Sequence, residues 1–276
     1  MKCKRIMTIL VIAVFLFTIA SASAGDVNDT VVASEDTGEI ELSSNDGIAE
    51  DILQTTQKNN TLIRANNEET VSSPADSQIL GAGEGTYSDL RNDINNGEIT
   101  KSLYRYVEGD GDSITITTNS KVIDGKGAVV DMAGSGIRAL VVTANDVTIK
   151  NFTFKNAKFN GDGGAIYSYG SSSGVAYTID IINCNFINNT VNKKGGAIYF
   201  DNKGSVDVVN CTFINNSAVE WGGAIMLDSG NVINCSFTNN KAGYGGAMYV
   251  SSQIITNCSF TNNSANAGGA ICVESI

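Results

Sequence analysis

The residues that could do acid–base chemistry in this chain are carboxylates, because the sequence contains no His. Hydrolysis of a glycosidic bond needs two of them on one face, about 5 to 9.5 Å apart. We expect that no two acidic residues after Asn151 occupy the same position in adjacent repeat units. The sequence therefore predicts no catalytic pair. The acids from Asn151 onward are Asp162, Asp180, Asp201, Asp207, Glu220, Asp228 and Glu274.

An arginine that could neutralise an acidic sugar is also missing from the later part, since no Arg follows Arg138. Elimination chemistry on such a sugar needs a base and a group that stabilises the developing negative charge. We therefore predict that the protein is not an enzyme. The alternative, a polysaccharide lyase or hydrolase, requires Asp124, Asp131 and Arg138 to converge on one groove.

Cysteine recurs in the pattern Asn-Cys-x-Phe, but without the spacing of a metal site. The chain has no Cys-x-x-Cys pair and no His, so we predict no metal and no cofactor. Side chains stacked in parallel at the strand spacing hold their β-carbons slightly too far apart for a disulfide. We expect buried free thiols that act as small hydrophobes, at Cys184, Cys211, Cys235 and Cys258.

Two repeated motifs must position these residues. The sequence Gly-Gly-Ala followed by Ile or Met starts at Gly163, Gly195, Gly222, Gly245 and Gly268, and Asn-Cys-x-Phe-x-Asn-Asn starts at Asn183, Asn210, Asn234 and Asn257. Such a period indicates units that bury their apolar faces by stacking. Each unit contains about three strand-length pieces and no helical stretch, which predicts an all-β parallel β-helix with about three strands per coil. We expect about seven turns.

Alternation within Asn-Cys-x-Phe-x-Asn-Asn predicts which side chains face inward. Cys and Phe are the apolar pair and should form two columns along the axis. The Asn pair follows where the strand must turn, because Asn tolerates the left-handed conformation and stacked amides can bond one another. The predicted ladders are the four Cys above, Phe186, Phe213, Phe237 and Phe260, and Asn189, Asn216, Asn240 and Asn263.

The residue after Gly-Gly-Ala is always apolar and should also face inward. The next residue then points outward, which predicts an exposed stripe containing Tyr167, Tyr199 and Tyr249 together with Met226 and Cys272. Exposed Tyr rings can stack on sugars, so the three Tyr are candidate ligand-binding residues. Two alternatives remain open: a ladder that stacks only on itself, and the opposite register, with the Tyr column buried.

The N-terminal part is organised differently. Residues 1–24 have a basic start, an apolar run and small residues near Ala24, which predicts a cleaved signal peptide and export. Residues 25–85 are acidic and lack periodicity, which predicts a disordered linker. A short helix with a Thr86–Asp89 capping box should begin the β-helix domain, residues 86–276. The net charge of −11 argues against a nucleic-acid partner.

The stretch from Val122 to Asn156, together with Gly-Gly-Ala-Ile-Tyr and Asn-Cys-Thr-Phe-Ile-Asn-Asn, resembles adhesin-like surface proteins of methanogenic archaea. The paired Gly-Gly-Ala-Ile and Phe-x-Asn-Asn motifs are similar to those of chlamydial polymorphic outer-membrane proteins. The resemblance covers residues 86–276 and implies a right-handed β-helix, export and a role at the cell surface. Members usually continue into further repeats and an attachment module, so a sequence that stops at Ile276 suggests a truncated chain.

These observations favour a secreted or cell-surface protein that binds a glycan, or another host or microbial cell-surface ligand, through a repeated outward face. Many weak contacts along an axis suit multivalent binding better than a single catalytic pocket. A third possibility is a passive envelope or stalk protein without a ligand. An open strand edge at the last coil also predicts end-to-end self-association.

Overall fold

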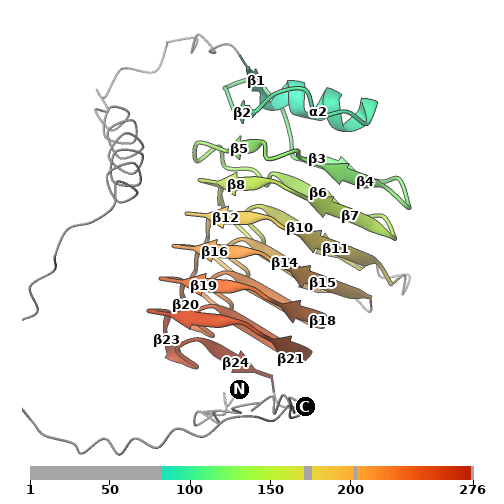
Figure 1. Cartoon of the computed structure of the whole chain (residues 1–276). Coiled ribbons are helices and arrows are strands. Elements are labelled where there is room, and N and C mark those ends of the chain that lie inside the picture. Colours follow the sequence, from blue (N-terminus) through green and yellow to red (C-terminus); the bar gives the residue numbers. More distant parts are fainter. Residues whose placement is uncertain (1–82, 171–175, 202–203, 275–276) are drawn as a thin grey trace, which may run out of the picture. The chain divides into compact units, whose positions relative to one another are not determined.

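The computed structural model describes residues 83–170, 176–201 and 204–274 (Figure 1). The predicted signal peptide and nearly all of the predicted linker lie outside these residues. The described part is a parallel β-solenoid of about six turns, which confirms the predicted fold class. The expected seven turns were one too many, because the strands between Ile114 and Lys155 make only two coils, and β24 (Ile271–Val273) only begins another.

Three parallel sheets form the sides of the solenoid. Sheet A contains β1 (Glu84–Thr86), β2 (Leu103–Arg105), β5 (Val129–Asp131), β8 (Thr153–Lys155), β12 (Asn185–Ile187), β16 (Thr212–Ile214), β19 (Ser236–Thr238) and β22 (Ser259–Thr261). Sheet C contains β9 (Lys158–Phe159), β13 (Thr190–Val191), β17 (Ser217–Ala218), β20 (Lys241–Tyr244) and β23 (Ser264–Ala267).

Sheet B receives two strand segments from each coil. They are separate strands in the early coils and join into one nine-residue strand in the later, shorter ones. Its strands are β3 (Ile114–Ile116), β4 (Val122–Asp124), β6 (Leu140–Val142), β7 (Val147–Lys150), β10 (Ile166–Tyr169), β11 (Thr178–Ile182), β14 (Ile198–Asp201), β15 (Ser205–Val209), β18 (Ile225–Ile233), β21 (Met248–Thr256) and β24.

The register aligns identical motif positions from coil to coil. Phe213 pairs with Phe186 on one side and with Phe237 on the other. Its ring lies 4.9 Å from the Phe186 ring and 4.7 Å from the Phe237 ring, nearly parallel to both. Phe260 continues the stack, and Cys184, Cys211 and Cys235 lie buried in the same core. The predicted inward Phe and Cys columns are therefore confirmed.

The two glycines of each Gly-Gly-Ala motif have different roles. The first adopts a left-handed φ, +64° at Gly195, which non-Gly residues reach only with strain. The second lets two coils approach: a Cβ added at Gly196 would lie 2.0 Å from the carbonyl oxygen of Gly223. Both positions therefore serve the backbone geometry of the coil.

Helix α2 (Tyr87–Asn96) closes the N-terminal end of the solenoid (Figure 1). The Thr86 hydroxyl accepts from the Asp89 N–H, and the Asp89 carboxylate accepts from the Thr86 N–H, which confirms the capping box. Tyr87, Leu90 and Ile94 are buried on the first coil. β1 pairs in parallel with β2, so Glu84 and Gly85 form part of sheet A.

Candidate functional site

The Tyr column is not the exposed stripe that the sequence predicted. Tyr167, Tyr199 and Tyr249 do point away from the main core, because the preceding Ile166, Ile198 and Met248 are buried in it. Yet Tyr199 is 5% and Tyr249 3% exposed, and Tyr167 is half-buried. With Met226 and Cys272 they form a second apolar cluster on the outer surface of sheet B.

Side chains that directly precede two of the Gly-Gly-Ala motifs, together with Arg138, cover this cluster. The Trp221 ring stacks on Tyr249 at 4.7 Å, and the Lys194 ammonium lies 3.9 Å from the Trp221 ring centre. Arg138 covers Tyr167 in the same way, 3.8 Å from its ring centre. Alternation predicts the side of a sheet on which a residue lies, but not whether another segment folds over it. The Tyr rings therefore stabilise the coil and are not open to a sugar in this structure.

A column of acids stands beside the Tyr cluster, and sequence reasoning missed it. Phe200 pairs with Leu227, so Asp201 and Asp228 occupy the same position in adjacent coils. The expectation that no two acids align is therefore wrong; Asp180 and Asp207 also pair directly. The signal was present in the sequence, since both Asp201 and Asp228 lie six residues after the first Gly of their motif.

Burial has a clear electrostatic effect at Asp228. Burial, a hydrogen bond to Asp201, and the charges of Asp201 and Glu274 raise the pKa of Asp228 to about 7, which the Lys194 ammonium partly opposes. The Tyr199 hydroxyl donates to Asp201 at 2.7 Å, and the Ser251 hydroxyl donates to Glu274 at 3.1 Å. One carboxyl of the Asp201–Asp228 pair therefore keeps a proton near neutral pH.

The second Asn of each repeat forms the inner ladder that the sequence predicted. The Asn189 side-chain amide donates to Oδ1 of Asn216 at 3.0 Å, and the Asn216 amide donates to Oδ1 of Asn240 at the same distance. Asn240 continues to Asn263. Asn189, Asn216 and Asn240 are fully buried, so this ladder holds the corner between sheets A and C and does not face a ligand.

The cysteine column consists of free thiols, as expected. Each backbone N–H of Cys184, Cys211 and Cys235 donates to the sulfur of the next Cys at 3.4 Å. The Cys211 thiol donates in turn to the carbonyl of Val209 at 3.2 Å. Contacts with the Cys184 and Cys235 thiols, together with burial, raise the pKa of Cys211. Each thiol of the column also donates to a backbone carbonyl, so the column is part of the structural core.

Two further columns of Asn lie on the outside, one at each edge of sheet A. The first Asn of each motif and the first Asn of each pair have left-handed φ near +55° and are exposed. Asn151 donates to Asp124 at 2.8 Å, and Asn183 donates to Asn151 at 3.3 Å. The exposed Asn are Asn183, Asn210, Asn234 and Asn257 on one edge, and Asn188, Asn215, Asn239 and Asn262 on the other.

Asp124 and Asp131 stand at the first coil of these outer columns. The hydrogen bond from Asn151 is the main cause that lowers the pKa of Asp124, which also pairs with Lys150 at 3.3 Å. Asp131 accepts from Asn156 at 2.9 Å and pairs with Lys155 at 3.1 Å. Arg138 lies between the rings of Phe159 and Tyr167. Because each residue is held by different partners, the structure does not bring the three together as the enzyme alternative required.

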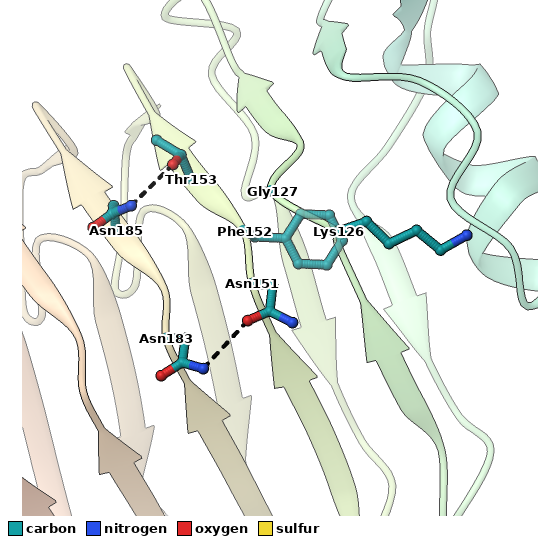
Figure 2. Close-up of a pocket in the computed structure, with 7 residues that line it drawn as sticks. All are labelled: Lys126, Gly127, Asn151, Phe152, Thr153, Asn183 and Asn185. Carbon is teal, nitrogen blue, oxygen red and sulfur yellow. Dashed lines mark hydrogen bonds between the residues drawn. The ribbon is translucent and has the colours of Figure 1, made fainter.

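A polar groove of about 320 Å³ lies at the N-terminal end of sheet A (Figure 2). Asn183 and Asn151 line one side through their mutual hydrogen bond, while Asn185 donates to the Thr153 hydroxyl at 3.2 Å. The turn of Lys126 and Gly127 forms the end wall. This groove offers amides and a hydroxyl to a ligand and was not predicted from the sequence.

Other kinds of site are not assembled among the described residues. Within residues 83–170, 176–201 and 204–274, no three His, Cys, Asp or Glu are grouped so that they could hold a metal ion. Across the same ranges, no helix is long and apolar enough to cross a membrane.

The comparisons with known proteins concern the C-terminal coils. The Chlamydia polymorphic membrane protein repeat matches residues 183–201, 210–227, 234–250 and 257–274. Comparisons with curated proteins and with solved structures gave no match. Each matched segment runs from the outer Asn through the Phe column to the strand after Gly-Gly-Ala, so it covers most of one coil. The chain therefore carries four Chlamydia polymorphic membrane protein repeats, which fit a surface or outer-membrane-associated repeat protein.

Proposed function

We propose that this protein is an exported, adhesin-like protein that binds glycan on a host or microbial cell surface and catalyses no reaction. The observation that carries the proposal is the strict register of the four repeats. Since Phe186, Phe213 and Phe237 stack in one column, the outward residues beside them also recur once per coil. A ligand with its own repeat can then make the same weak contact several times, which multiplies its affinity.

The Tyr column is no longer the candidate binding surface, because Tyr199 and Tyr249 are covered. The exposed amides and hydroxyls of sheet A support glycan binding instead, since sugars present hydroxyl groups that both donate and accept. A passive envelope or stalk protein would carry the same register without a ligand.

A glycan array tests the proposal. The full-length chain is applied to an array of neutral and acidic microbial wall polysaccharides and mucin glycans, with circular dichroism to verify β-structure in the sample. We expect reproducible binding to at least one polymeric glycan. A folded sample that binds no glycan on the array would contradict the proposal and favour the passive role.

A second candidate function rests on the Asp201–Asp228 pair. Two carboxylates in adjacent coils, hydrogen-bonded to each other with one of them protonated near pH 7, offer a general acid and a general base for polysaccharide hydrolysis. The test is release of new reducing ends from neutral and acidic polysaccharides by the wild type and by Asp228→Asn. Release that the substitution abolishes would establish this function; no release from any polymer would reject it.

A further inference from the structure

We infer that the outer surface of sheet A is the glycan-binding face, and that its ligand is an uncharged polysaccharide chain lying along the solenoid axis. This inference rests on the proposed function and adds the surface and the ligand class. We call this surface the amide face. Its residues are the two outer Asn columns named above and the outward side chains between them: Asn185, Ile187, Thr212, Ile214, Ser236, Thr238, Ser259 and Thr261.

The amide face carries no charge. From Asn183 to Asn262, every outward residue of the sheet A strands and of their two edges is Asn, Ser, Thr or Ile, although the chain has a net charge of −11. An acidic polysaccharide would bring carboxylates against a surface without a cation to pair with them. A neutral sugar loses no ionic hydration there, so the face favours an uncharged ligand.

The amide face also keeps unused hydrogen-bonding capacity. An Asn side chain has two N–H donors and an oxygen with two acceptor sites, and a bond to the next coil uses only one of each. Asn234 donates to Asn210 at 3.1 Å, which fixes its orientation but leaves its second N–H directed away from that bond. Asn210 and Asn234 thus present donors and acceptors whose side-chain orientation is already fixed before binding.

The repeat distance suits a chain of sugars. Equivalent positions in adjacent coils are separated by the strand spacing, roughly 4.8 Å. This is close to the length that one monosaccharide adds to an extended polysaccharide, so successive sugars would meet the same Asn and Thr positions. Ile187 and Ile214 lie between the polar columns and can contact the C–H faces of sugar rings.

The groove at Lys126 and Gly127 lies where this path reaches the first coils. It is lined by Asn151, Asn183 and Asn185, which extend the amide face toward α2 (Figure 2). Lys126 extends toward the helix and pairs with Glu98 at 3.7 Å, so its charge is directed away from the amides. The groove can therefore hold one end of the polysaccharide.

Calorimetric titration of the full-length chain tests the assignment. The probes are cellohexaose and mannohexaose as neutral hexamers, and hexagalacturonate as an acidic hexamer of equal length. Two variants remove groups from the amide face: Thr212→Val with Thr238→Val removes two hydroxyls, and Asn210→Gly with Asn234→Gly removes two amides while tolerating the left-handed φ. The control, Thr256→Val, removes an exposed hydroxyl from sheet B in a column that already contains Val209 and Ile233.

We expect a neutral hexamer to bind and hexagalacturonate to bind at least tenfold more weakly. Each amide-face variant should weaken binding of the neutral hexamer by tenfold or more, while Thr256→Val leaves it unchanged. If the wild type and both variants bound the neutral hexamer equally, the amide face would not be the binding surface, but the proposed function would still stand. Preference for hexagalacturonate, or no binding of either neutral hexamer, would overturn the ligand class, while the glycan array decides separately whether any glycan is bound.

Discussion

Asn216 links three coils through one buried side chain. Its amide nitrogen donates to Oδ1 of Asn240 and to the carbonyl of Phe186, each at 3.0 Å, and its own oxygen accepts from Asn189. The side chain is fully buried. Every hydrogen-bonding atom of this amide has a partner, which is the condition under which a buried polar ladder stabilises a core.

Replacing Asn216 by Ala should therefore be strongly destabilising. The change removes these bonds and leaves the backbone N–H and one side-chain N–H of Asn189 unsatisfied, while Oδ1 of Asn240 keeps only the bond from the Asn216 backbone N–H. We expect a loss of about 2 to 4 kcal/mol in the free energy of unfolding. Urea titration followed by circular dichroism measures it. The matched control is Asn215→Gly, at an exposed residue with φ of +55°, which should lose less than about 1 kcal/mol. Equal losses for the two variants would refute the role of the ladder.

The second glycine of the repeat gives a prediction with an internal control. A Cβ on Gly223 would lie 2.1 Å from the carbonyl oxygen of Gly246, whereas a Cβ on Gly269 would lie 3.7 Å from its nearest contact. We expect Gly223→Ala to prevent folding or lower the melting temperature by 10 °C or more, and Gly269→Ala to change it little. Thermal unfolding of both variants measures the difference. Similar melting temperatures would show that close coil approach does not depend on glycine.

Substitution within the covered Tyr column should reduce the stability of the fold. Tyr199 stacks on Tyr167 at 5.4 Å and is 5% exposed. Tyr199→Ala should cost about 3 to 5 kcal/mol of stability, as for other buried aromatic residues. Tyr199→Phe loses only the hydrogen bond to Asp201 and should cost about 1 kcal/mol. An Ala variant as stable as the wild type in urea would mean that the column is exposed after all.

The Asp201–Asp228 pair makes stability depend on pH. The folded state holds the Asp228 proton up to a pKa of about 7, whereas an unfolded Asp releases it near 3.8. The folded state therefore binds more protons between these values, and stability falls as pH rises from about 4 to about 7. Because solvent screens a half-buried carboxyl, we expect a change of about 1 kcal/mol.

Asp228→Asn should remove this dependence. The variant should be more stable than the wild type at pH 8, and the difference should shrink toward pH 4, where the wild-type carboxyl is neutral in the folded state and the unfolded carboxyl begins to bind its proton. Urea midpoints across this range measure it, with Glu220→Gln as a control at an exposed acid outside the pair. If the stability difference between Asp228→Asn and the wild type did not change with pH, Asp201 and Asp228 would not share a proton.

Much of the fold follows from the sequence because the repeats are local and periodic. The inward direction of Phe213 and Cys211 follows from alternation, the turn at Asn215 from its tolerance of positive φ, and the start of α2 from Thr86 and Asp89. These features depend on a few neighbouring residues. Stacking then repeats the same side-chain directions and turns in every coil.

The surface could not be predicted as fully. Whether Tyr249 is exposed depends on Trp221, which comes from the turn of the preceding coil and folds across the sheet. To predict the outer Asn columns, one would have to know that Asn151 and Asn183, thirty-two residues apart in the sequence, lie side by side in adjacent coils. The alignment of Asp201 with Asp228 was available from the motif spacing, but unequal unit lengths concealed it.

Under the proposed function, the repeated coils bind one glycan chain through several equivalent contacts. The most direct test is calorimetric titration of the full-length chain with neutral oligosaccharides of one, two, four and six sugars from the series that binds best. Multivalent binding along the amide face predicts that affinity rises at least tenfold between the dimer and the hexamer. If the dimer bound as tightly as the hexamer, the glycan would occupy a single pocket, which would contradict multivalent binding along the amide face.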